Sequence, residues 1–125
     1  DYKALEDFHE FRLEAEKKRF RYFLEVFNPN VDPGIPDRKV AGFLNDHIIR
    51  TLAGVTSAGR PLFLKIPYNG PGPLEELVSY DSRLIVGILG GSAGTTLDAF
   101  QLIHDAKKHG ARVALFGRKI NLSEH

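Results

Sequence analysis

The chain has 125 residues, of which 42% are hydrophobic and 26% are charged, a balance typical of one globular unit and not of a disordered segment. Its formal net charge of +1 excludes the strong basic excess of a dedicated nucleic-acid binder, and no apolar run is long enough to indicate a membrane-bound protein. The absence of cysteine excludes disulfides, thiolate metal sites and cysteine nucleophiles, and it favours a cytoplasmic protein.

The first third of the chain predicts a helix, a strand and a second helix. Residues 3–19 place Leu5, Phe8, Phe11 and Ala15 at helical spacing. Residues 21–28 are rich in aromatic and branched side chains, and the proline and glycine clusters that follow would end a strand there. Apolar residues then recur at helical spacing over residues 38–53.

The remainder repeats this alternation of strands and helices. Strands are predicted over residues 61–67, 84–89 and 112–116, with a short helix over 73–78 and a longer helix from Thr96 that a capping pattern of Thr95 and Asp98 would start. The spacing of the strands indicates an α/β fold with four parallel strands in a single domain, residues 1–125. Periodicity leaves two architectures open, an open doubly wound sheet and one half of an eight-stranded barrel.

Two charged residues interrupt the apolar strands. Side chains alternate between the faces of a strand, so Lys65 lies on the face opposite Leu64 and Ile66, near the carboxyl end of its strand. Glu25 occupies the comparable place on the first strand. A lysine amine in that position attacks a carbonyl to form a Schiff base, and a neighbouring carboxylate would accept its proton. The alternative is an ion pair that only stabilises the structure.

Glycines follow the last two strands. Gly90, Gly91 and Ser92 end one strand, and Gly117 and Arg118 end the next. Glycine lets a phosphate oxygen approach backbone N–H groups, and arginine adds a charged contact, so these loops predict a phosphate-binding site. The alternative is that the turns themselves require glycine. The histidines have no metal-ligand spacing, and we expect neither a metal nor a cofactor.

Four segments together resemble a known family: LEVFNPN, PLFLKIPYNG, LIVGILGGSAGTT and VALFGRKIN. They are similar to strands five to eight of the class I (Schiff-base) aldolase superfamily, which includes deoxyribose-phosphate aldolase and the archaeal-type fructose-bisphosphate aldolases. The resemblance covers residues 21–121. It implies a parallel (β/α) half-barrel, the carboxyl-terminal half of a TIM (β/α)8 barrel, with Lys65 as the Schiff-base lysine and Gly90-Gly91 and Gly117-Arg118 as phosphate loops. Residues 92–95 and the short helix before residue 84 depart from the family pattern, which leaves the substrate open.

The resemblance implies an aldolase-type lyase acting on a phosphorylated sugar or a similar keto or aldehyde substrate. One alternative is a non-catalytic module that binds a phosphate ligand or mediates assembly on the same scaffold. A weaker one is a dinucleotide loop at residues 87–94, which lack the G-x-G-x-x-G spacing. A half-barrel leaves two sheet edges open, so we expect either a homo-oligomer or the remainder of a longer parent chain to close it. The absence of any methionine favours the longer parent.

Overall fold

The computed structural model describes residues 2–91 and 94–121, in which helices and strands alternate as predicted. The elements are α1 (Tyr2–Lys17), β1 (Leu24–Glu25), α2 (Asp37–Leu52), β2 (Leu64–Ile66), α3 (Pro71–Tyr80), β3 (Val86–Leu89), α4 (Thr96–Lys108), β4 (Val113–Leu115) and α5 (Arg118–Asn121). Within these residues, no helix combines the length and the apolar composition that crossing a membrane requires.

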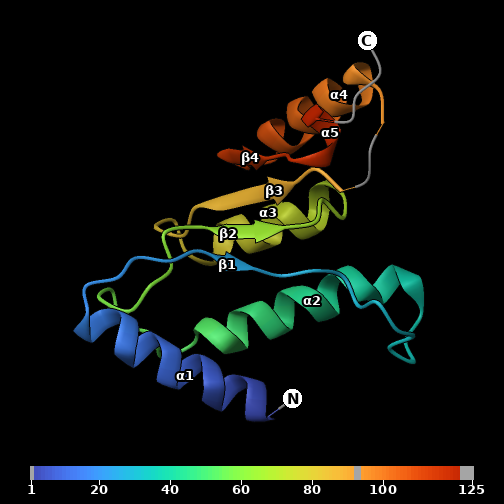
Figure 1. The fold of residues 1–125 in the computed structure, drawn as a ribbon. Coiled ribbons are helices and arrows are strands. Elements are labelled where there is room, and N and C mark those ends of the chain that lie inside the picture. The colour runs from blue at the N-terminus through green and yellow to red at the C-terminus, as the bar shows by residue number, and fades with distance from the viewer. Residues whose placement is uncertain (1, 92–93, 122–125) are drawn as a thin grey trace.

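The four strands form one parallel sheet in the order β1-β2-β3-β4, so each strand pairs with the next one along the chain. Helices α2, α3 and α4 lie on one side of this sheet, and no helix of the described residues covers the opposite face (Figure 1). This arrangement arises when all βαβ crossovers have the same handedness and each new strand adds to the same side of the preceding one. A doubly wound sheet would instead carry helices on both faces.

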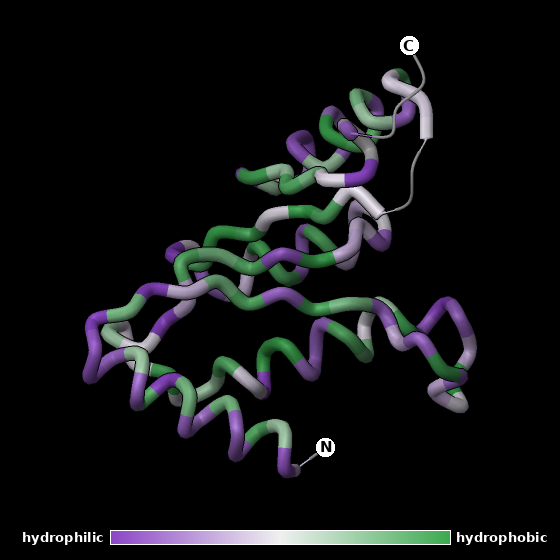
Figure 2. The backbone as a smooth tube through the Cα atoms, in the orientation of Figure 1, coloured by the Kyte–Doolittle hydropathy of each residue, from purple (hydrophilic) through white to green (hydrophobic). Residues whose placement is uncertain are grey.

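The hydrophobic core lies between the sheet and its helices. Alternate strand residues Leu64, Ile66, Val86 and Ile88 are between 0% and 4% exposed and point to the helix side. Leucines and isoleucines of α2 and α3 pack against them in the same cluster. Figure 2 shows the corresponding hydrophobic residues along β3 and in a stripe along α2. The apolar faces of α2 and α3 therefore face the sheet, as helical spacing predicts.

The strands are shorter than the sequence pattern predicts. Only Leu24–Glu25 of residues 21–28 is a strand, although backbone bonds to the β2 segment run from Tyr22 to Val26. Prolines have no N–H group and cannot donate to a ladder, which limits β2 between Pro61 and Pro67.

Helix α3 is longer than predicted because it begins at Pro71 instead of Pro73 and ends at Tyr80 instead of Val78. The missing N–H of proline costs nothing in the first turn of a helix. Gly70 precedes it with a φ of 99°, a value that favours glycine. The chain therefore turns directly from the loop after β2 into this helix.

Helix α1 is covered less completely than its amphipathic pattern suggests. Ala15 is its one buried residue in the described chain, while Leu5 and Phe11 are 48% and 46% exposed. The helix lies beyond β1, the last strand on that side of the sheet (Figure 1). Its apolar face therefore extends past the edge of the sheet and stays partly exposed.

Candidate functional site

The open face of the sheet carries both predicted catalytic residues. Glu25 is in register with Lys65, and Lys65 is in register with Gly87 on the other side. Residues in register share a face, so these three positions form a row across β1, β2 and β3. They alternate with the buried Leu64 and Ile66, which places the row on the face that no helix covers.

Lys65 and Glu25 form a close ion pair. The lysine Nζ lies 2.7 Å from the glutamate Oε1, and the two side chains are 22% and 30% exposed. Partial burial strengthens such a pair relative to one in open water, because less solvent screens the two charges. The prediction that the two residues lie within hydrogen-bonding reach is confirmed.

Gly87, on the other side of Lys65, is buried in a tightly packed part of the sheet. A Cβ atom there would lie 3.1 Å from the backbone oxygen of Leu64 and 3.1 Å from the Cβ of Val113, so a larger residue would crowd the sheet. The lysine is thus flanked by a carboxylate on one strand and by a position without a side chain on the next. Sequence reasoning did not assign Gly87 a role at this site, although a glycine inside an apolar strand is a known signal of close approach.

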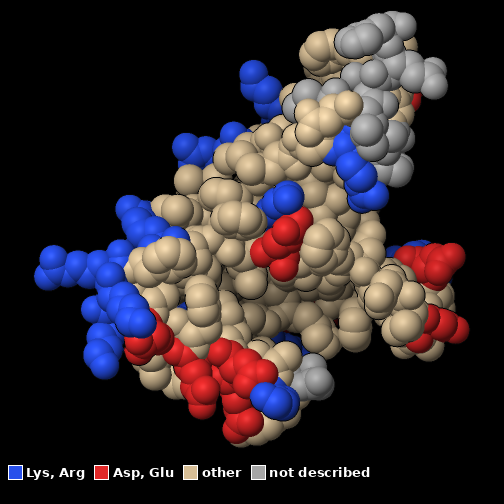
Figure 3. Space-filling model, viewed as in Figure 1, with Lys and Arg blue, Asp and Glu red and all other residues tan. Residues whose placement is uncertain are grey.

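Aromatic side chains share this face with the ion pair. Phe23 and Phe63 stack with ring centroids 4.9 Å apart and planes 7° apart, and Phe27 is 64% exposed. In Figure 3 charged side chains gather near the rim of this face, apart from a basic and an acidic group near its centre. The ion pair therefore lies within a largely apolar, uncovered surface.

The predicted phosphate-binding residues lie at the carboxyl ends of β3 and β4, which are adjacent strands. Gly91 is exposed with a φ of 68°, and Gly117 is exposed with no heavy atom within 4 Å of the place of a Cβ. Arg118 is exposed at the start of α5. Ser92 lies outside the described residues.

Gly90 differs from the other predicted phosphate-binding glycines because it is buried. A Cβ there would lie 2.8 Å from Cδ1 of the Phe116 ring. The close contact with this ring accounts for glycine at position 90 without any ligand. Gly91, Gly117 and Arg118 remain open to a phosphate group.

Two asparagines that sequence reasoning missed join the loops after β1 and β2. The amide of Asn28 donates to Oδ1 of Asn69 at 3.0 Å, and the amide of Asn69 donates to Oδ1 of Asn28 at 2.8 Å. Both residues follow the strands that carry Glu25 and Lys65. An asparagine follows each of two adjacent parallel strands, and this pattern would have predicted that the two side chains meet.

Tyr68, in the loop after β2, packs against the helix-side core instead of the open face. Burial raises the pKa of its phenol, and the nearby carboxylates of Asp105 and Glu75 raise it further. The phenol therefore stays protonated at neutral pH and is not a base for the site.

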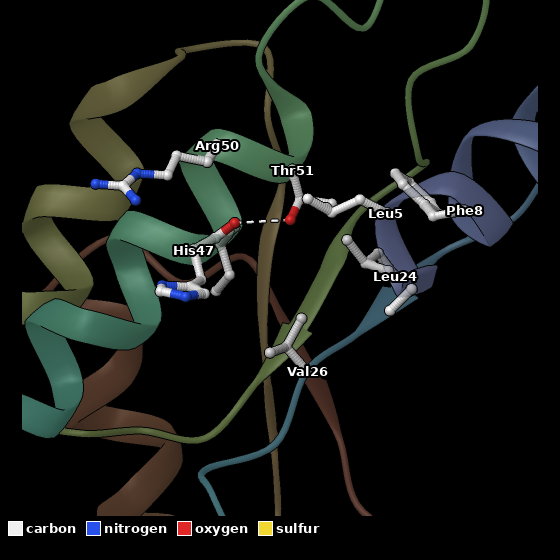
Figure 4. Close-up of a pocket in the computed structure, with 9 residues that line it drawn as sticks. Leu5, Phe8, Leu24, Val26, His47, Arg50 and Thr51 are labelled. Carbon is white, nitrogen blue, oxygen red and sulfur yellow. Dashed lines mark hydrogen bonds between the residues drawn. The ribbon is translucent and has the colours of Figure 1, made fainter. Parts of the chain in front are cut away.

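A cavity of about 480 Å³ lies on the helix side of the sheet, away from Lys65. Its lining is mostly apolar and comes from α1, the β1 segment and α2; Figure 4 shows Leu5, Phe8, Leu24 and Val26 at its wall. The Thr51 hydroxyl donates to the backbone oxygen of His47 at 2.7 Å, which satisfies it within the helix. Leu24 and Val26 alternate with Glu25, so the cavity and the ion pair are on opposite faces.

No cluster of histidine, aspartate and glutamate in residues 2–91 and 94–121 is placed to hold a metal ion. The chain matches no protein-family model, and no curated protein is similar enough to be identified as a relative. The resemblance to Schiff-base aldolases therefore stays a prediction.

Proposed function

We propose that this protein is a Schiff-base-forming aldolase, a carbon–carbon lyase that acts on a phosphorylated sugar or a similar keto or aldehyde substrate. The observation that carries the proposal is the Lys65–Glu25 pair on the uncovered face of a parallel sheet. An amine with a carboxylate 2.7 Å away has its proton acceptor already in place.

The reaction begins when the ammonium group of Lys65 transfers a proton to Glu25. The neutral amine adds to the substrate carbonyl, and a bond forms between Nζ and the carbonyl carbon. Glu25 returns its proton to the resulting hydroxyl, which leaves as water and produces an iminium ion. A base then removes the proton of the hydroxyl next to the breaking carbon–carbon bond, that fragment leaves as an aldehyde or ketone, and the electrons of the bond flow to the iminium nitrogen, giving an enamine. Gly87 places no side chain beside Lys65 on the neighbouring strand.

The loops after β3 and β4 hold the substrate phosphate in this proposal. Gly91 and Gly117 expose backbone N–H groups without a side chain above them, and the Arg118 guanidinium supplies positive charge. These loops lie at the same end of the sheet as the Asn28–Asn69 pair, because the carboxyl ends of parallel strands meet at one edge. The asparagine amides are suited to contact substrate hydroxyl groups.

The sheet itself is proposed to be strands five to eight of a TIM barrel. The sequential strand order, the helices on one side and the exposed Phe27 on the other support this assignment. A second copy of the chain, or the remainder of a longer parent chain, would cover the open face and supply a further acid or base for the carbon–carbon step.

Borohydride trapping tests the proposed function. The protein is incubated with a ketose phosphate and sodium borohydride, and peptide mass mapping then locates the reduced adduct. We expect the adduct on Lys65, none in Lys65→Arg, and an unchanged amount in Lys39→Arg, whose lysine is exposed on α2. Glu25→Gln should slow adduct formation by roughly 10²- to 10⁴-fold. An adduct that persists in Lys65→Arg would refute the assignment.

A non-catalytic phosphate-binding or assembly module is the second candidate. The exposed Phe27 favours it, because a large apolar side chain on an uncovered face is also what an assembly surface presents. It predicts that phosphate raises the unfolding temperature, that Arg118→Gln abolishes this effect, and that no adduct forms with any ketose or aldehyde phosphate. A trapped adduct on Lys65 would exclude it.

A further inference from the structure

A second pocket, which is polar and has a volume of about 340 Å³, lies at the amino-terminal end of the sheet, opposite the loops that follow the strands. The end of α1, the segment before β1 and the segment before β2 form its walls. Four arginines line it: Arg12, Arg19, Arg21 and Arg60. Figure 3 shows basic side chains gathered over this end of the molecule. The chain therefore has a local basic site although its net charge is near zero.

The acidic groups around the pocket are fewer than the basic ones. Glu16 is the one carboxylate in its lining, and Asp81, outside the lining, forms an ion pair with Arg60. These two carboxylates face four guanidinium groups, which leaves an excess of positive charge. An anion is therefore the ligand that the pocket would attract.

Arg19 adopts a left-handed backbone conformation that favours glycine and disfavours most residues with a side chain. Its φ is 55°, the only positive value among the described non-glycine residues. It ends α1 in a Schellman arrangement, in which the Phe20 N–H bonds to the Ala15 oxygen at 2.7 Å and the Arg19 N–H bonds to the Glu16 oxygen at 3.0 Å. Glycine would satisfy this turn with less strain. Strain at such a position indicates a use for the side chain beyond folding.

The wall of the pocket is held in place before any ligand binds. The Tyr22 hydroxyl donates to the Gly59 oxygen at 2.7 Å, and burial raises the pKa of Tyr22, so this bond persists at neutral pH. A Cβ at Gly59 would lie 3.3 Å from Nη1 of Arg12 and 3.3 Å from Oε2 of Glu16, so glycine lets both side chains approach the backbone closely. The buried Nε of Arg12 has no hydrogen-bond partner among the described residues.

We propose that this pocket binds a phosphate-type oxyanion, carried by a small phosphorylated metabolite or present as free phosphate. Planar guanidinium groups match phosphate oxygens in geometry and charge. Its volume falls near the lower end of the range for small-ligand pockets, about 300 to 1,000 Å³, which excludes a large ligand. The site is separate from Lys65 and does not depend on the proposed aldolase activity.

Titration of the intact protein with inorganic phosphate and with glycerol 3-phosphate, followed by amide NMR at constant ionic strength, tests this proposal. We expect shifts at residues 19–22 and 57–60. Arg19→Gly and Arg21→Gln should each weaken binding roughly tenfold, while Arg38→Gln, an exposed arginine on α2, should change it less than twofold. Arg19→Gly should also unfold at the same or a higher temperature, which separates lost binding from lost folding.

The two anions distinguish the source of the phosphate group. Tighter binding of the monoester indicates a phosphorylated metabolite, and equal binding indicates free phosphate. Arg118→Gln should leave these shifts unchanged, because Arg118 lies at the other end of the sheet. Loss of phosphate binding at the loops after β3 and β4 can therefore be distinguished from loss of binding at this pocket. The absence of shifts at the pocket, or equal weakening by Arg38→Gln, would overturn the proposal.

Discussion

Replacement of Gly90 by alanine should destabilise the fold through a single contact. The added Cβ would lie 2.8 Å from Cδ1 and 2.9 Å from Cγ of the Phe116 ring. Carbon atoms in contact prefer about 3.5 to 4.0 Å, so the ring must move by about 1 Å. Phe116 packs against the hydrophobic core and has little room to do so. Overpacking of this kind costs about 1 to 3 kcal/mol.

Urea unfolding monitored by circular dichroism measures this cost. With a slope of about 2 kcal/mol per molar, a loss of about 2 kcal/mol lowers the midpoint by about 1 M. Gly117→Ala is the matched control, because no heavy atom lies within 4 Å of its added Cβ, and it should change stability by less than about 0.5 kcal/mol. Gly91→Ala should cost about 1 kcal/mol through its φ of 68° alone.

The double variant identifies the cause. In a Phe116→Ala background the ring is gone and only the Cβ of residue 116 remains, 3.2 Å from the added Cβ, so Gly90→Ala should cost at least about 1 kcal/mol less than in the original chain. An equal cost of Gly90→Ala in both backgrounds would show that Phe116 is not the reason for glycine at this position. The reasoning would also fail if Gly90→Ala in the original chain had no measurable effect.

Three further changes should have defined effects. Asn45→Ala removes two partly buried hydrogen bonds from α2 to α3, of 2.8 Å and 2.7 Å, and should lower the free energy of unfolding by about 1 to 3 kcal/mol in the same urea assay. Thr95→Ala breaks the capping box with Asp98 and should cost about 1 kcal/mol, with faster hydrogen exchange of the first α4 amides. The backbone N–H of Arg83, followed by charge contacts with neighbouring arginines, lowers the pKa of Asp81 below its ordinary value of 3.8. The ionised Asp81 carboxylate therefore contributes its full stabilisation above pH 3.8, and this stabilisation is lost as the pH falls through the lower folded-state pKa. The melting temperature of Asp81→Asn should therefore fall less steeply on acidification than that of the original chain.

Much of the fold could be predicted because its signals are local. The Thr95–Asp98 capping pattern starts α4, and alternation along β2 places Lys65 opposite Leu64 and Ile66. The pairing of Lys65 with Glu25 required one further step, that consecutive strands are neighbours, which is the usual outcome in βαβ folds.

The features that escaped prediction depend on contacts between distant residues. The sequence does not distinguish a glycine that a bound phosphate requires from one that a neighbouring ring requires, so the contact of Gly90 with Phe116 could not be predicted. The positive φ of Arg19 has no sequence signal, since glycine is the usual residue in that conformation. The Arg12 and Arg60 side chains meet in one pocket only because α1 lies next to residues 57–60, which precede β2.

The sequential strand order also has a consequence for how the chain acquires its structure. The loop that closes β2 on β3 runs from Leu64 to Val86 and is shorter than the loop from Leu24 to Leu64. Closing a shorter loop costs less chain entropy, so the β2-α3-β3 unit is the folding nucleus that forms with the smallest loss of chain entropy. Strands β4 and β1 can then join from either side without rearranging what has already formed. A chain built this way can fold progressively while it emerges from the ribosome.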